Sequence, residues 1–137
     1  MPDVVPMISY EDGVAALEWL ARAFGFRERA RMLGPNGELA HGELEAGDGL
    51  IMLATPTPDY ESPRRHREHC ESARKWSQVP YVIDGVLVEV DDVDAHCARA
   101  RQAGALILSE PADGGNGRLY RAEDLEGHRW MFMQRGS

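Results

Sequence analysis

The 137-residue sequence is poor in cysteine, and it contains no long apolar segment. Its two cysteines, Cys70 and Cys97, form no Cys-x-x-Cys pair, so we expect reduced thiols rather than a disulfide framework. No apolar run approaches the roughly 20 residues that cross a bilayer. Residues 1–9 lack the basic and apolar regions of an export signal. We therefore expect a cytoplasmic protein with no membrane partner.

Positive charge is also scarce, since 15 basic residues face 23 acidic ones and the formal net charge is −8. An acidic surface repels phosphate backbones, which argues against nucleic acid as a partner. The composition, 43% hydrophobic and 28% charged, is typical of a globular protein. The length fits a single domain over residues 1–137.

The first 54 residues predict the order β-α-β-β-β. Val4–Tyr10 is rich in β-branched residues, Asp12 stands where a helix N-cap is expected, and Gly25 suits the helix end. The apolar residues between them fall on one helical face: Val14, Leu17, Leu20 and Phe24. Three further strands are predicted at residues 26–33, 38–45 and 50–54, separated by turns at 35–37 and 47–49.

The same pattern returns after a proline-rich connection over residues 55–84. Asp92 is a second predicted N-cap, and Gly104 closes the helix that follows it. Its apolar face comprises Val93, Cys97, Ala100 and Ala103. Strands are predicted at 85–90, 105–108, 118–122 and 129–134, with a loop at 113–117 and a turn at 124–127.

Landmarks of three kinds recur at nearly the same spacing. The pairs are Asp12 and Asp92, 80 apart, Gly25 and Gly104, 79 apart, and Met52 and Met131, also 79 apart. This offset indicates an internal duplication. We expect an α+β fold in which modules 1–54 and 85–137 are joined by the connection 55–84.

Several motifs resemble those of the vicinal oxygen chelate superfamily, which includes glyoxalase I, bleomycin-resistance proteins and extradiol dioxygenases. The motifs are Ala-Phe-Gly-Phe at 23–26, Val-Glu-Val-Asp-Asp at 88–92 and Asp-Leu-Glu-Gly-His-Arg-Trp at 124–130. The resemblance is strongest to small bacterial glyoxalase-like members. It departs from the family pattern at Leu125, which replaces the proline of the usual Asp-Pro-x-Gly turn.

The resemblance implies two βαβββ modules whose half-barrels enclose one cavity, and it implies a homodimer. Family enzymes hold a divalent metal with four His, Glu or Gln side chains. The resemblance places these positions at Val5, Met52, Gly85 and Met131. Such residues do not bind a hard divalent cation. We therefore expect no metal and no cofactor.

Strand alternation assigns the residues that face this cavity. The expected ligand-binding lining is Met7, His41, Glu43, Met52, Leu87, Glu89, Arg129, Met131 and Met133. Apolar walls with a few oriented charges are typical of small-molecule sites. The alternatives are that the methionines fill a closed core, that His41 pairs with Glu43, and that Glu89 pairs with Arg129.

The connection carries two further clusters. His66, His69 and Cys70 have partial metal-ligand spacing, but we favour a solvated surface. The basic residues are expected to meet acids of the same chain or of a dimer partner, with anion binding as the alternative; they are Arg64, Arg65, Arg67, Arg74 and Lys75. Three aromatic residues either cover a cavity mouth or pack the connection: Tyr60, Trp76 and Tyr81.

Three functions follow from these observations. The favoured one is a metal-free binding protein, without an assigned catalytic residue, that sequesters a hydrophobic or cationic drug or metabolite. The second is an enzyme of the superfamily, a metal-dependent lyase, isomerase or dioxygenase, or one that uses His41 and Glu43 as an acid–base pair. The third is a structural or regulatory homodimer with no ligand.

Overall fold

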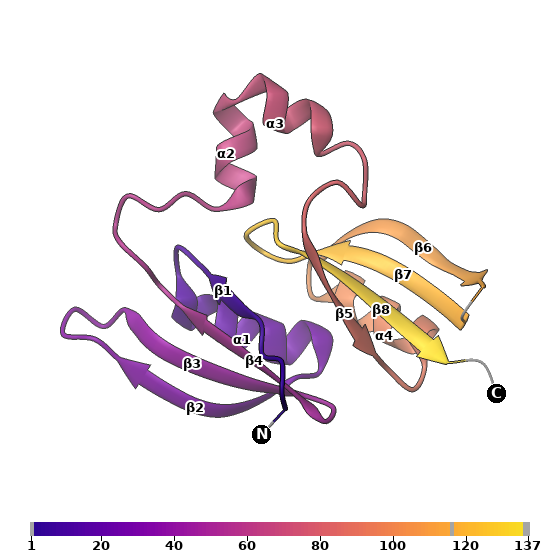
Figure 1. Ribbon diagram of the computed structural model, residues 1–137, viewed down its shortest axis with the longest axis horizontal. Helices are drawn as coiled ribbons and strands as arrows, with labels where there is room; N and C mark the ends of the chain where they lie inside the picture. Colours follow the sequence, from indigo (N-terminus) through magenta and orange to yellow (C-terminus); the bar gives the residue numbers. More distant parts are fainter. Residues whose placement is uncertain (1, 116, 136–137) are drawn as a thin grey trace. The chain divides into compact units, whose positions relative to one another are not determined.

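The computed structural model describes residues 2–115 and 117–135, and it divides into two compact units (Figure 1). Unit 1 spans Met1–Ser62, and unit 2 spans Pro63–Ser137. Each unit contains one βαβββ module, so the predicted α+β fold of two such modules is confirmed. The expectation of one single domain stays a prediction.

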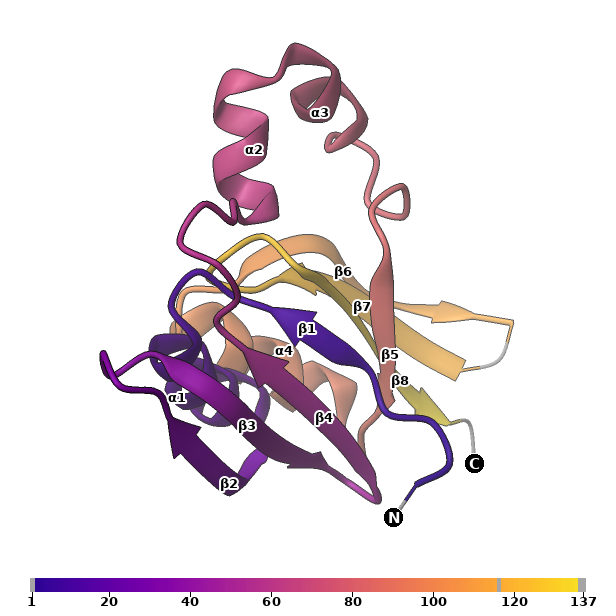
Figure 2. The same ribbon diagram turned by 60° about the vertical axis from the view of Figure 1, so that its left-hand side comes forward.

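Unit 1 is a four-stranded mixed sheet with one helix. Its elements are β1 (Met7–Ser9), α1 (Gly13–Phe24), β2 (Arg27–Leu33), β3 (Leu39–Ala46) and β4 (Gly49–Ala54). The strand order is β1-β4-β3-β2, in which β1 and β4 are parallel and the other pairs antiparallel. Helix α1 packs on one face of this sheet (Figure 2).

The predicted caps define α1. The Asp12 carboxylate accepts a hydrogen bond from the Ala15 backbone N–H at 3.1 Å. Gly25 ends the helix with φ of 75°, in the left-handed region that glycine adopts without strain. Leu17, Leu20 and Phe24 are buried as predicted, because they share the face that packs on the sheet.

Unit 2 repeats this arrangement after two short helices. Its elements are α2 (Pro63–His69), α3 (Glu71–Trp76), β5 (Gly85–Glu89), α4 (Val93–Gln102), β6 (Leu106–Gly114), β7 (Gly117–Glu123) and β8 (Arg129–Arg135). The strand order is β5-β8-β7-β6, with β5 parallel to β8. The equivalent of Asp12 is Asp92, whose carboxylate accepts from the Ala95 N–H at 3.1 Å.

The core of unit 2 lies between α4 and its sheet. Tyr120, Trp130 and Phe132 are buried there, and the His96 ring of α4 lies 4.1 Å from the Phe132 ring. His96 Nδ1 also lies 2.5 Å from the Tyr120 hydroxyl. These contacts fix which face of the sheet α4 covers.

The turn after β7 holds its shape without the family proline. The buried Asp124 carboxylate accepts from the backbone N–H groups of Glu126 and His128, both at 3.0 Å. Its other oxygen accepts from Trp130 Nε1 at 3.1 Å. Leu125 does not fix the backbone φ as a proline would, so the hydrogen bonds of Asp124 stabilise this turn.

Two boundaries differ from the prediction by more than two residues. Strand β1 covers only 7–9 of the predicted 4–10, and the Pro6 carbonyl instead accepts from the Met52 N–H. Strand β6 continues to Gly114, into the predicted loop, because Ala112 and Asp113 pair with β7. Asn116 of that loop lies outside the described residues. Within the described ranges no helix has the length and apolar character needed to span a membrane.

Candidate functional site

The candidate site is built on the face of the unit 2 sheet opposite α4. Leu87 of β5 pairs with Met131 of β8, and Met131 pairs in turn with Arg121 of β7. Paired residues on adjacent strands place their side chains on the same face. The neighbouring strand row is Gly85, Arg129 and Glu123.

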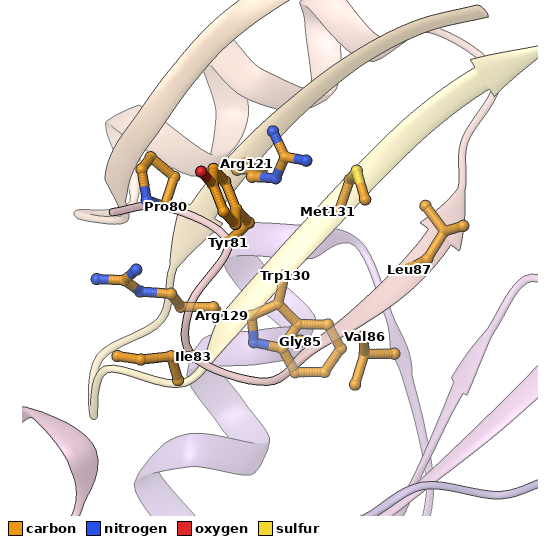
Figure 3. Close-up of a pocket in the computed structure, with 10 residues that line it drawn as sticks. All are labelled: Pro80, Tyr81, Ile83, Gly85, Val86, Leu87, Arg121, Arg129, Trp130 and Met131. Atoms are coloured by element: carbon orange, nitrogen blue, oxygen red, sulfur yellow. The ribbon is translucent and has the colours of Figure 1, made fainter. Parts of the chain in front are cut away.

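A pocket of about 160 Å³ lies over these rows (Figure 3). The segment before β5 forms one wall, and β5, β7 and β8 form the others. The lining residues are Pro80, Tyr81, Ile83, Gly85, Val86, Leu87, Arg121, Arg129, Trp130 and Met131. Leu87, Arg129 and Met131 of the predicted lining are thus brought together in this pocket.

Arg129 plays a different part from the free polar contact expected of it. Its side chain is 4% exposed, and its guanidinium donates to the Ser77 carbonyl at 2.6 Å and to the Val79 carbonyl at 2.9 Å. Two further bonds, at 2.7 and 3.0 Å, reach one oxygen of Glu123. The suggested pairing of Arg129 with Glu89 is therefore wrong, and the acid that holds Arg129 is Glu123.

Glu123 is fully buried and is bound by two arginines. Arg67 of α2 donates to both carboxylate oxygens, at 2.6 and 2.9 Å, in addition to the bonds from Arg129. Burial raises the pKa of Glu123, but the hydrogen bonds and charges of the two arginines outweigh burial and lower it overall. For Arg67, the expectation that the basic connection meets an acid of the same chain is confirmed.

The Glu123–Arg129 pair fixes one wall of the pocket. Because Arg129 holds the carbonyls of Ser77 and Val79, the segment that follows them is anchored to β8. Tyr81, 73% exposed, and Ile83 extend from this segment over the strands. Of the aromatic residues named as candidate covers, Tyr81 lines this pocket.

Arg121 was missed by the sequence analysis. Its side chain lines the pocket beside Met131, on the strand face opposite the buried Tyr120 and Ala122. Period-two alternation over residues 118–122 carries the signal that would have identified it. Tyr120 and Ala122 flank Arg121 and are both apolar, so alternation places Arg121 on the other face, together with Leu119.

The predicted lining residues of unit 1 form a separate, smaller pocket of about 110 Å³. Met7, His41 and Met52 line it. The Glu43 carboxylate accepts a hydrogen bond from His41 Nε2 at 2.8 Å and lies 3.3 Å from Arg29 Nε. The suggested pairing of His41 with Glu43 is confirmed.

Glu89 and Met133 are paired with each other on β5 and β8. They lie one row beyond Leu87 and Met131, and neither is among the residues that line the unit 2 pocket. Their assignment as ligand contacts stays a prediction.

A broader hollow of about 400 Å³ lies on the other side of the Glu123–Arg129 pair. Seven of its nine lining residues are polar and two are leucines: Arg67, Glu68, Arg74, Ser77, Gln78, Leu106, Leu108, Glu123 and Arg129. Leu106 and Leu108 form its apolar part, and its central charges, Arg67, Glu123 and Arg129, bind one another.

The residues at the family's metal positions do not fit a divalent cation. Val5 precedes β1, while Met52, Gly85 and Met131 lie on strands, and the four offer two thioethers and no imidazole or carboxylate. Across residues 2–115 and 117–135, no group of three or more His, Cys, Asp or Glu has a metal-binding arrangement. The His66 and His69 rings instead contact each other edge-on at 5.9 Å.

Comparison with known proteins places these features in context. The family model described as "Glyoxalase/Bleomycin resistance protein/Dioxygenase superfamily" matches residues 5–132. The structure of TioX from Micromonospora sp. ML1 is similar with 31% identity and a TM-score of 0.70, over 99% of this chain and 98% of that one.

Two further solved structures share the fold. TnmS3, an antibiotic binding protein from Streptomyces sp. CB03234, has 22% identity and a TM-score of 0.64, with 98% of both chains covered. A bleomycin-binding protein from Streptomyces verticillus, complexed with copper(II)-bleomycin, has 16% identity and a TM-score of 0.62, over 99% of this chain and 98% of that one.

Proposed function

This chain belongs to the Glyoxalase/Bleomycin resistance protein/Dioxygenase superfamily, and we propose that it is a binding protein that takes up a hydrophobic small molecule without a metal ion. The observation that carries this proposal is the unit 2 pocket. Its walls include Tyr81, Ile83, Leu87 and Met131, and its volume of about 160 Å³ equals several water molecules. Such apolar walls around a few polar groups suit a small organic ligand.

The similar structures support the proposal. An antibiotic binding protein and a bleomycin-binding protein share this fold, although their identities of 22% and 16% carry no ligand across to this chain. The Met131 side chain of the pocket is unbranched and can adapt to ligands of different shape. Of the two ligand classes expected from the sequence, hydrophobic and cationic, the pocket favours the first, because none of its ten lining residues is acidic.

Ligand-dependent thermal stabilisation tests the proposal. We expect a set of aromatic and polycyclic compounds to contain members that raise the Tm of the protein, with the same shift in the presence of EDTA. Leu87→Ser should weaken this binding, because Leu87 lines the pocket. Leu106→Ser is the matched control, since Leu106 is 47% exposed against 53% for Leu87 and does not line that pocket. A set that shifts the Tm nowhere, or equal losses in both variants, would contradict the proposal.

An enzymatic function is the second candidate, and the 2.8 Å contact of His41 with Glu43 favours it. A histidine held by a carboxylate is a common general base. Metal analysis of protein purified without chelator addresses the metal-dependent version, which stoichiometric Zn, Ni, Mn or Fe would support. Turnover of a ligand that His41→Gln abolishes without loss of binding would support the metal-free version.

The pocket also bears on the third candidate, a structural or regulatory dimer with a filled core. An open volume beside Met131 is not expected of methionines that fill the module. The homodimer and the cytoplasmic location stay predictions.

A further inference from the structure

Two arginines line the unit 2 pocket, Arg121 and Arg129, and they differ in the partners that their guanidinium groups have. Arg129 is ion-paired with Glu123, which it shares with Arg67, and it donates further hydrogen bonds to the carbonyls of Ser77 and Val79. Arg121 is half-buried beside Met131. Within the described part of the chain, it has no ion pair and no hydrogen bond. A guanidinium among apolar groups loses hydration without recovering it from a protein partner.

The acids nearest to Arg121 in the sheet either bind other arginines or lie two strands away. Glu123 is two residues further along β7 on the same face, but both of its oxygens are bound by Arg67 and Arg129. Glu89 lies on β5, with β8 between it and β7. The pocket therefore has an uncompensated positive charge although the whole chain carries −8.

A second polar group lies in the same row of the sheet. Ser109 of β6 pairs with Arg121 in the β6–β7 register. The Ser109 hydroxyl oxygen is buried and has no hydrogen-bond partner among the described residues. Buried hydroxyls are normally satisfied, so this row has two adjacent polar side chains whose bonding capacity is unused.

The repeat provides an internal comparison. The row Met7, Met52, Glu43 and Ala30 of unit 1 corresponds to Leu87, Met131, Arg121 and Ser109 of unit 2, at offsets of 80, 79, 78 and 79. In unit 1 the charged member, Glu43, is bound by His41 and Arg29. The corresponding charge in unit 2 has the opposite sign and no such partners.

We propose that the ligand of the unit 2 pocket is an apolar organic acid, whose oxyanion binds the guanidinium of Arg121 and whose body packs on Tyr81, Leu87 and Met131. This inference rests on the proposed binding function and specifies its ligand class. A planar guanidinium matches a carboxylate through two parallel hydrogen bonds. Apolar walls strengthen that attraction, because they lower the local dielectric constant.

Three probes that share a naphthalene body and differ in charge test the inference: 2-naphthoate, 2-naphthamide and 2-naphthylmethylammonium. Calorimetry at 0.15 M salt should give the naphthoate an affinity about tenfold above that of the neutral amide. The ammonium probe should bind weakest. Arg121→Met should reduce the naphthoate affinity to about that of the amide and leave the amide affinity within about twofold.

Arg118→Met is the matched control. It removes the same charge from the same strand, but Arg118 points to the other face and pairs with Asp94 of α4. It should preserve the naphthoate preference, whereas Arg121→Lys should retain part of it. Equal binding of all three probes, or an unchanged preference in Arg121→Met, would overturn the inference while leaving the proposed function in place. Failure of every probe to bind would count against the proposed function itself.

Discussion

At the scale of single residues, the most consequential side chain of unit 2 is Glu123. Its side chain is fully buried, and its two carboxylate oxygens accept hydrogen bonds from Arg67 and Arg129. Neutralising one partner of a buried ionic network leaves the other charges uncompensated. The Glu123 carboxylate therefore determines both the stability of the unit and the position of the Ser77–Ile83 wall.

We expect Glu123→Gln to lower the free energy of unfolding by about 3 kcal/mol, because the buried Arg129 and the partly exposed Arg67 would lose the counter-charge that they share. Urea unfolding followed by circular dichroism measures this loss. The control is Glu110→Gln, since Glu110 pairs with Arg101 on an exposed surface, where such pairs contribute less than about 1 kcal/mol. Similar losses in both variants would show that the buried network adds nothing beyond a surface pair.

The same variant predicts a pH dependence. The pKa of Glu123 is below its ordinary value of 4.5 in the folded protein, so its stabilising contribution is complete above about pH 4.5. That contribution is lost as the pH falls through the lowered pKa. The difference in unfolding free energy between wild type and Glu123→Gln should thus be constant from pH 7 to about 5 and shrink below about 4.5. A difference that grows on acidification would contradict the assignment.

At the scale of elements, helices α1 and α4 begin with the same N-cap. The carboxylates of Asp12 and Asp92 each accept a hydrogen bond at 3.1 Å from the backbone N–H of the residue three positions later. We expect Asp12→Ala and Asp92→Ala each to lower the free energy of unfolding by about 1 kcal/mol. Asn at either position should retain most of the stabilisation that the cap contributes. Urea titration measures both, with Asp48→Ala in the exposed β3–β4 turn as control. Losses no larger than that of the control would show that the caps are not stabilising.

Local signals were sufficient to predict most elements. Caps, glycines and Asx turns act over a few residues, and they placed α1, α4 and the hairpin turns correctly. The end of β6 was wrong because its pairing with β7 is a longer-range effect. Pro111 lies where the register shifts between Ser109 and Ala112, and the strand resumes beyond it.

The site was predictable in part for the same reason. Alternation correctly placed Leu87 and Met131 on one face, since their side chains follow the strand period. The role of Arg129 depends on Ser77, 52 residues away, and Glu123, and no local pattern specifies that contact. The isolation of Arg121 depends in turn on Glu123 being bound by Arg67 of α2, which only the tertiary structure reveals.

At the scale of the whole molecule, duplication has left two similar sheets with different charge. Glu43 and Arg121 occupy corresponding positions of the two sheets. Glu43 is bound by His41 and Arg29, whereas Arg121 has no ion pair among the described residues. A net charge of −8 opposes the approach of an anion from a distance. At 0.15 M salt the Debye length is about 8 Å, so the attraction of a bound anion to Arg121 should exceed its repulsion by acidic side chains that lie farther away than this.

This reasoning yields a prediction that separates the local charge from the global one. Glu110→Gln changes the net charge by one unit, in the opposite direction from Arg121→Met, and it acts at the exposed Arg101–Glu110 pair of α4 and β6. We expect it to leave the ratio of naphthoate to naphthamide affinity within about twofold at 0.15 M salt, because the charge of an exposed carboxylate that is paired with Arg101 is screened. Calorimetry at 0.05 and 0.3 M salt supplies the second measurement. If Glu110→Gln raised the ratio severalfold at both salt concentrations, anion selectivity would belong to the charge of the molecule and not to the Arg121 row.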